Sequence, residues 1–115
     1  MERTVAGFLL VAAGGFVGAV ARYGVDVAAG DVTGIGTFAV NVIGSFALGL
    51  LVTRAATRRT QLFVGTGALS SFTTYSTFAG DAVALGTVDG GLYVLASYAV
   101  GLTAAAFGLA IGRRL

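Results

Sequence analysis

The stretch Leu69–Phe78 reads L-S-S-F-T-T-Y-S-T-F and places a block of hydroxyl side chains inside an otherwise apolar segment. A polar group that lies in hydrocarbon without a partner costs roughly several kcal/mol. Two explanations are open. Either these side chains bond back to carbonyls one turn earlier in a continuous helix, or the block is locally non-helical and lines a polar path. The rest of the chain favours the second explanation.

The composition is typical of an integral membrane protein. Of the 115 residues, 57% are hydrophobic and only 10% are charged, and the mean hydropathy is +0.93. So few charges cannot cover the surface of a soluble protein of this size. The chain has 19 Gly and no Pro, and small residues let membrane helices approach one another closely. We expect one domain that covers residues 1–115.

Several classes of chemistry are excluded by residue types that the chain lacks. Neither Cys nor His occurs, which removes disulfides, thiol chemistry, zinc sites and any nucleophile–histidine dyad. No acid, base and nucleophile converge anywhere, so we do not expect an enzyme. All seven basic residues are Arg and most lie at segment ends, which indicates membrane topology rather than a nucleic-acid surface.

Four apolar segments predict four transmembrane helices, at about 5–25, 36–53, 62–85 and 91–112. Each is long enough to cross a bilayer. The first could be read as a signal peptide, because Ala19-Val20-Ala21 resembles a cleavage site, but a retained helix is simpler when more spans follow. Four spans place both termini on one side of the membrane.

The distribution of Arg predicts which side that is. Only Arg22 lies near the side opposite the termini, where Asp26, Asp31, Asp81 and Asp89 also lie. We expect a plasma-membrane protein, and the positive-inside rule predicts that both of its termini lie in the cytoplasm. The basic residues on the side of the termini are Arg3, Arg54, Arg58, Arg59, Arg113 and Arg114.

Small residues recur at helical spacing in the first, second and fourth segments, and we interpret these glycines as sites of close helix packing. Asn41 differs, because its amide has two donors and two acceptors and needs a partner or a polar path in mid-membrane. Arg22 either extends to the interface or sets the electrostatics of a vestibule that attracts anions.

The polar groups inside the segments favour an anion. A cation path or proton relay usually needs buried carboxylates, and we place all the acidic residues, Glu2 and the four Asp, at segment ends. Hydroxyls, the Asn41 amide and aromatic ring edges all present positively polarised hydrogens. Such groups bind an anion weakly enough for it to leave again.

Three motifs resemble those of the CrcB/Fluc fluoride channel family. Residues 14–23 (GGFVGAVARY) are similar to its first-helix motif, and residues 36–46 (GTFAVNVIGSF) to its second-helix motif. Thr73–Phe78 (TTYSTF) is similar to its T-T-F-S-T-F signature, and Tyr93, Ser97 and the Gly-rich residues 101–112 fit its fourth helix.

The resemblance implies an all-α membrane protein with four transmembrane helices, the third broken in mid-membrane. It also implies an antiparallel dimer with two pores. Tyr75 and Phe78 would form a box whose ring edges face fluoride, and Ser76 and Thr77 would extend a polar track. Arg22 would lie in the vestibule. The fluoride pore residues implied in this way are Asn41, Thr74, Tyr75, Ser76, Thr77, Phe78, Tyr93 and Ser97.

The resemblance further implies a structural Na⁺ at the dimer centre, bound by the backbone carbonyls of Ser70 and Thr73. This chain departs from the family pattern in having Ser70-Ser71 where Gly-Gly is usual, Tyr75 where Phe is usual, and Gly101 where a hydroxyl is often found. If the break requires a positive φ, a serine there is strained.

The expected function is passive export of fluoride from the cytoplasm, which would reduce fluoride toxicity. Two alternatives are a small four-helix multidrug or cation exchanger, which would need an embedded acid in the first helix, and a non-transporting membrane assembly subunit. The Arg bias suggests a fixed orientation and a dimer with an oppositely oriented homologue, although a homodimer is the other possibility.

Overall fold

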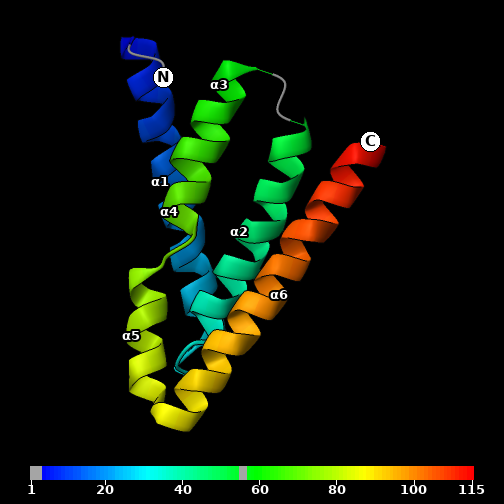
Figure 1. Cartoon of the computed structure of the whole chain (residues 1–115). Coiled ribbons are helices and arrows are strands. Elements are labelled where there is room, and N and C mark those ends of the chain that lie inside the picture. Colours follow the sequence, from blue (N-terminus) through cyan, green and yellow to red (C-terminus); the bar gives the residue numbers. More distant parts are fainter. Residues whose placement is uncertain (1–3, 55–56) are drawn as a thin grey trace.

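The computed structural model describes residues 4–54 and 57–115, and this part of the chain contains helices and no strand. Figure 1 shows the helices side by side in an elongated bundle whose principal extents are 46 × 31 × 24 Å. In chain order the elements are α1 (Val5–Ala29), α2 (Ile35–Arg54), α3 (Arg58–Thr60), the π-helix η1 (Gln61–Leu69), α4 (Ser70–Phe72), α5 (Ser76–Leu85) and α6 (Thr87–Arg114).

Within the described residues, three helices are long and apolar enough to cross a membrane: α1, α2 and α6. The α1 helix begins where the Thr4 hydroxyl accepts a hydrogen bond from the Gly7 N–H at 3.1 Å, which satisfies one of the free donors of the first turn. It continues to Ala29 and ends at Gly30, whose φ of 73° a residue with a side chain rarely adopts.

The predicted third span is divided in the structure. Helix η1 and the short α4 run from Gln61 to Phe72, and α5 resumes at Ser76. Between them Thr73 is extended, with φ −85° and ψ 161°. No described residue other than glycine has a positive φ. The serines of the Ser70-Ser71 pair therefore cause no backbone strain.

Close contacts at glycines create two tight seams. A Cβ at Gly14 would meet the carbonyl oxygen of Phe63, and one at Gly18 would meet that of Ala68, so α1 lies directly on η1. Helices α2 and α6 meet in the same way, since a Cβ at Gly108 would meet the carbonyl oxygen of Phe46. The interpretation of the glycines as packing positions is confirmed at these seams.

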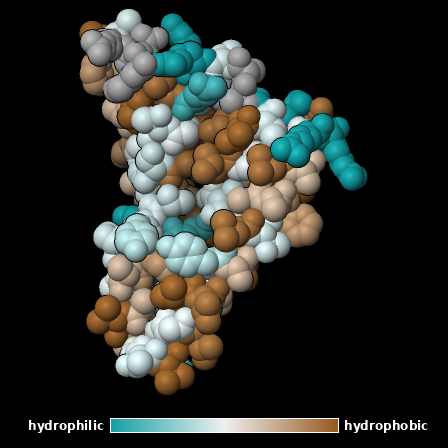
Figure 2. All heavy atoms as spheres, viewed as in Figure 1, coloured by the Kyte–Doolittle hydropathy of each residue, from teal (hydrophilic) through white to brown (hydrophobic). Residues whose placement is uncertain are grey.

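The first described residues and the C-terminus lie at the same end of the bundle (Figure 1). Hydrophilic residues gather at this end in Figure 2, where large apolar side chains cover much of the rest of the visible surface. Many large apolar side chains are exposed, including Phe16, Leu95, Leu102 and Phe107. Such a surface suits lipid or another protein chain.

Candidate functional site

Asn41 of α2 binds the non-helical stretch between α4 and α5 through both the nitrogen and the oxygen of its side-chain amide. Its Nδ2 donates to the carbonyl oxygen of Thr74, and its Oδ1 accepts from the Thr74 N–H, both at 2.9 Å. These two backbone groups have left the helix, and in an apolar setting an unpaired backbone group is costly. The partner that Asn41 required is therefore the backbone of the break.

The hydroxyl chain on the α5 side of the break is a short run of contacts that the Thr74 hydroxyl makes with the Ser76 hydroxyl and the Thr77 N–H. The Thr74 hydroxyl accepts from the Thr77 N–H at 3.2 Å and lies 3.5 Å from the Ser76 hydroxyl oxygen. The first of these contacts satisfies a free N–H in the first turn of α5, whose N-cap residue is Tyr75. Thr74, Ser76 and Thr77, all predicted pore residues, are thus brought together at one helix end.

Hydroxyls on the α4 side behave differently and bond back to carbonyls of the same segment. The Thr73 hydroxyl donates to the Leu69 carbonyl at 2.9 Å, and the Ser70 hydroxyl donates to that of Gly65 at 3.3 Å. The Ser71 hydroxyl lies 2.8 Å from the Gly15 carbonyl of α1 and is also within reach of two carbonyls of η1. Bonding back to carbonyls therefore accounts for the hydroxyls on the α4 side, and residues 73–75 are locally non-helical.

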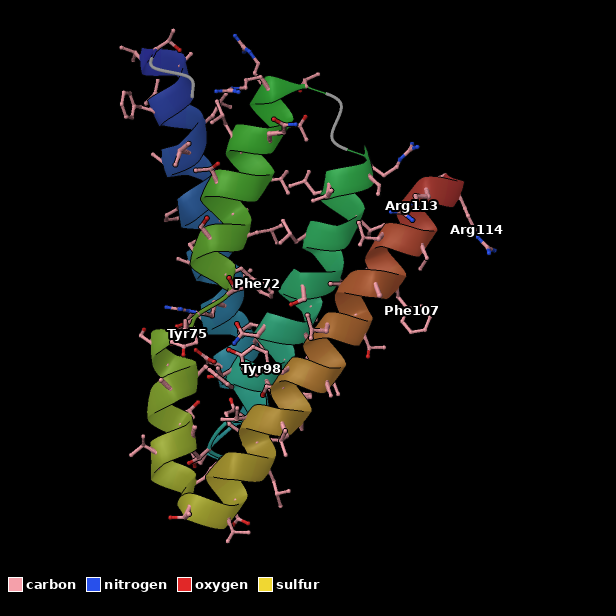
Figure 3. All side chains as sticks on the ribbon, viewed as in Figure 1. Phe72, Tyr75, Tyr98, Phe107, Arg113 and Arg114 are labelled. Atoms are coloured by element: carbon pink, nitrogen blue, oxygen red, sulfur yellow. The ribbon has the colours of Figure 1, made fainter. Side chains whose placement is uncertain are left out.

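Aromatic rings surround Phe78 on the α5 side. Its ring centroid lies 5.7 Å from that of Tyr75 and 5.4 Å from that of Tyr93. Tyr98 makes an edge-to-face contact with it, at 6.1 Å and 84°. Phe78 is only 7% exposed, whereas Tyr75 is 71% exposed. Figure 3 shows Tyr75 at the break and Tyr98 on the neighbouring α6 helix, while Phe107 points away from the bundle.

Open cavities flank the break on either side of Asn41. One of about 360 Å³ lies toward α6, and a second of about 390 Å³ lies toward η1 and α4. Asn41, Ser45, Leu48 and Tyr75 line both. The first cavity is completed by Phe78, Ser97, Tyr98, Gly101, Leu102 and Ala105, and the second by Gly44, Gly65, Leu69, Ser70, Thr73 and Thr74.

Ser97 carries the clearest sign of a missing partner. Its hydroxyl oxygen is buried, yet it has no hydrogen-bond partner among the residues that the structure describes. Buried polar atoms are nearly always paired. Because Ser97 lines the 360 Å³ cavity together with Asn41 and Phe78, a small hydrogen-bond acceptor there would satisfy it.

Of the two remaining predicted residues, Tyr93 packs against the aromatic cluster and Arg22 lies outside the cavities beside Asn41. The Tyr93 hydroxyl donates to the Gly34 carbonyl at 3.1 Å, and its ring packs against Phe78. Arg22 is half-buried on α1 and does not line either cavity beside Asn41.

Sequence reasoning missed two features of the site. Tyr98 belongs to the aromatic cluster, and the only available signal was an aromatic hydroxyl within an apolar helix. The second is Asp81, which the sequence pattern wrongly predicts to lie at a segment end. It lies half-buried within α5 and accepts a 2.8 Å hydrogen bond from the Thr37 hydroxyl of α2.

Similar proteins are named as fluoride channels. Fluoride-specific ion channel FluC of Agrobacterium fabrum is 45% identical over 119 residues, which cover 92% of this chain and 95% of the relative. FluC 1 of Natronomonas pharaonis is 47% identical over 100 residues, covering 83% and 84% of the two chains. FluC 1 of Halobacterium salinarum is 51% identical over 83 residues, covering 70% and 69%.

The family described as CrcB-like protein, Camphor Resistance (CrcB), matches residues 9–109. This range includes Asn41, the break after Phe72, the aromatic cluster and Ser97. The resemblance that the three sequence motifs indicated is confirmed. This chain belongs to the CrcB-like family.

Proposed function

We propose that this chain is a subunit of a fluoride-selective channel that passively exports fluoride from the cytoplasm and so reduces fluoride toxicity. One observation carries the proposal. Asn41 holds a non-helical stretch between two cavities, and the buried Ser97 hydroxyl in one of them has no partner among the described residues. The relatives named fluoride-specific ion channel support the choice of ion.

Selectivity would come from weak donors at fixed positions. Fluoride would lose water and gain contacts with the edges of Tyr75 and Phe78, where the ring hydrogens carry partial positive charge. The Ser97 hydroxyl and those of Thr74, Ser76 and Thr77 supply further donors. No single contact is strong, so the ion can enter and leave. The membrane potential, about 2.3 kcal/mol per charge per 100 mV, drives an anion outward.

The pore would be completed by a second subunit in an antiparallel dimer with two pores, with the break of the third helix at mid-membrane. Both cavities beside Asn41 open to the outside of the single chain. The α6 face that carries Leu95, Tyr98 and Leu102 is exposed. A partner that covers this face would close the cavity toward α6 and exclude lipid from its polar groups.

The backbone before the break suits a structural Na⁺ at the dimer centre. Na⁺ is a hard cation, and backbone carbonyl oxygens are suitable ligands for such ions. Ser70 belongs to the last turn before the break, where carbonyls lose their helical partners. The Thr74 N–H bonds to Asn41 instead of the Ser70 carbonyl. Ser70 and Thr73 could therefore offer carbonyls to the ion, and Ser in place of Gly is no obstacle.

The orientation we propose places both termini in the cytoplasm. Arg54, Arg58, Arg59, Arg113 and Arg114 are all exposed, and Figure 3 shows the last two at the end of α6. A homodimer of antiparallel subunits would need a chain that inserts in both orientations, which this bias disfavours. We therefore propose that the partner is a homologue that inserts in the opposite orientation, instead of a second copy of this chain. Labelling of tags at each terminus tests this, and equal labelling from both sides of the membrane would instead indicate a homodimer.

The alternatives receive less support. An exchanger would need an embedded acid in the first helix, and the only acid in α1 is Asp26, which is exposed. A purely structural subunit would give no role to the hydrogen bonds of Asn41 with the break or to the Ser97 hydroxyl, which has no partner in residues 4–54 and 57–115.

Efflux from liposomes, followed with a fluoride electrode, tests the proposed function. The reconstituted chain, alone or with a paired homologue, should release fluoride when the membrane potential is clamped with an ionophore, and should retain chloride in the same vesicles. Absence of fluoride efflux in both preparations would remove the proposal. Chloride efflux at a similar rate would remove the claim of selectivity.

A further inference from the structure

We infer that Asp81 is an electrostatic brake, meaning that its negative charge repels fluoride and slows its passage at the acidic end of the proposed path. Thr37 is the positioning residue that keeps the Asp81 carboxylate against α2. The inference rests on the proposed function and concerns a carboxylate that the proposed pore does not use. It starts from the hydrogen bond between the Thr37 hydroxyl and an Asp81 carboxylate oxygen, 2.8 Å long.

The pair is the second of two polar contacts between α2 and the segment that contains the break. The first joins Asn41 to Thr74. Thr37 lies one helical turn before Asn41, and Asp81 lies one turn after Thr77, so each shares a face with a predicted pore residue. The two contacts therefore follow one another along the same side of the molecule.

A third cavity, of about 260 Å³, connects this pair with the hydroxyl chain. Thr77, Thr37 and Asp81 all line it, together with the exposed carboxylates of Asp26 and Asp31. An anion that leaves the hydroxyls of Thr74, Ser76 and Thr77 on this side meets the Asp81 carboxylate next. A negative charge there lowers the local concentration of fluoride.

The burial of Thr37 explains why Asp81 stays in place. Thr37 is only 5% exposed, so its hydroxyl donor cannot turn to bulk water and is satisfied by the carboxylate. A carboxylate and fluoride are both acceptors, so they compete for the same kind of donor. With the hydroxyl of Thr37 engaged, the charge is held at the wall of the cavity instead of moving freely across it.

Fluoride efflux from neutral-lipid liposomes at low ionic strength tests the brake. Asp81→Asn keeps an acceptor for Thr37 but removes the charge, and we expect efflux to rise about two- to fivefold, as for a unit charge several ångströms from the ion in water. The increase should shrink as potassium gluconate is added, because salt screens the charge. Asp89→Asn, the same change in the exposed first turn of α6, should leave efflux unchanged.

Variants of Thr37 test its positioning role. Thr37→Ser retains the hydroxyl and should match the wild type, whereas Thr37→Val releases the carboxylate and should lower efflux. On the Thr37→Val background, Asp81→Asn should raise efflux by a larger factor than on the wild-type background. An equal or smaller factor would show that Thr37 does not position the charge.

The outcomes separate this inference from the proposed function. If Asp81→Asn does not raise fluoride efflux above the wild-type rate, the brake is overturned and the proposed channel function stands. The same holds if added salt does not reduce the increase. If Asp81→Asn fails to fold, the wild-type protein still tests the inference. Its fluoride efflux should rise when potassium gluconate is added, because salt screens the Asp81 charge. A wild type that releases no fluoride under any of these conditions overturns both.

Discussion

The two halves of the third helical segment differ in how they are held. The half before the break, η1 and α4, lies on α1 through backbone contacts at Gly14 and Gly18. The half after it, α5, makes one backbone contact of this kind, where the Ala82 carbonyl lies against Gly90 of α6, and meets its other neighbours through the side chains of Phe78 and Asp81. Backbone contacts fix a position for the chain, whereas side chains can also be presented to a ligand. The first half therefore serves as an anchor, and the second carries the groups that an ion would contact.

The largest effect should come from Gly14→Ala, which disrupts the packing of α1 against η1 in the anchor half. The added Cβ would meet the Phe63 carbonyl, and we expect the free energy of unfolding to fall by about 1–3 kcal/mol or more. The melting temperature in detergent micelles measures it. Gly15→Ala is the matched control, because nothing lies within 4 Å of its Cβ position. Equal melting temperatures for both variants would contradict the tight seam.

Asn41→Asp weakens the hydrogen bonding between α2 and the break that joins the two halves. The carboxylate can still accept from the Thr74 N–H but no longer donates to the Thr74 carbonyl. We expect fluoride efflux to fall about tenfold or more, which corresponds to about 1.4 kcal/mol, while the protein still inserts and elutes as one species. Thr103→Ala, which removes an exposed hydroxyl bonded within its own helix, should conduct normally. Normal efflux in Asn41→Asp would refute the pore assignment.

Phe78→Ile probes the ligand-facing half. The change keeps an apolar side chain but removes the ring edge at the centre of the aromatic cluster. Because an aromatic contact is worth about 0.5–1.5 kcal/mol, we expect fluoride efflux to fall by a few-fold. Tyr75→Phe keeps the ring and should stay close to the wild type. If Tyr75→Phe lowers efflux as much as Phe78→Ile does, the Tyr75 hydroxyl contributes as much as the Phe78 ring edge.

The smallest effects should come from serine variants in the anchor half, beginning with Ser71→Ala. This change removes the 2.8 Å contact with the Gly15 carbonyl of α1, and interhelical hydrogen bonds in membranes contribute about 0.6 kcal/mol on average. The melting temperature should fall slightly, and less again for Ser70→Ala, whose hydroxyl bonds only within its own segment. A larger loss for Ser70→Ala would reverse the assignment of the interhelical contact.

Much of the site could be predicted because its residue types are unusual for their surroundings. Asn41, the hydroxyl block and the aromatic residues contrast with an apolar chain, and they attract attention for that reason. The structure brings Tyr75, Phe78 and Tyr93 together as one cluster and places Ser97 in the cavity lined by Asn41. Asp81 was misplaced because its single charge lies near the end of an apolar run, where an exposed turn is the ordinary interpretation.

The sequence by itself determined the class of protein, the helical segments and the residues that give the hydroxyl block its chemistry, because hydropathy and residue type are local properties. Only the tertiary structure decided how the block Leu69–Phe78 is divided. Ser70, Ser71 and Thr73 bond back to carbonyls, while Thr74 leaves the helix for Asn41. That outcome depends on a side chain 33 residues away. Spacing along one segment contains no information about such a distant partner.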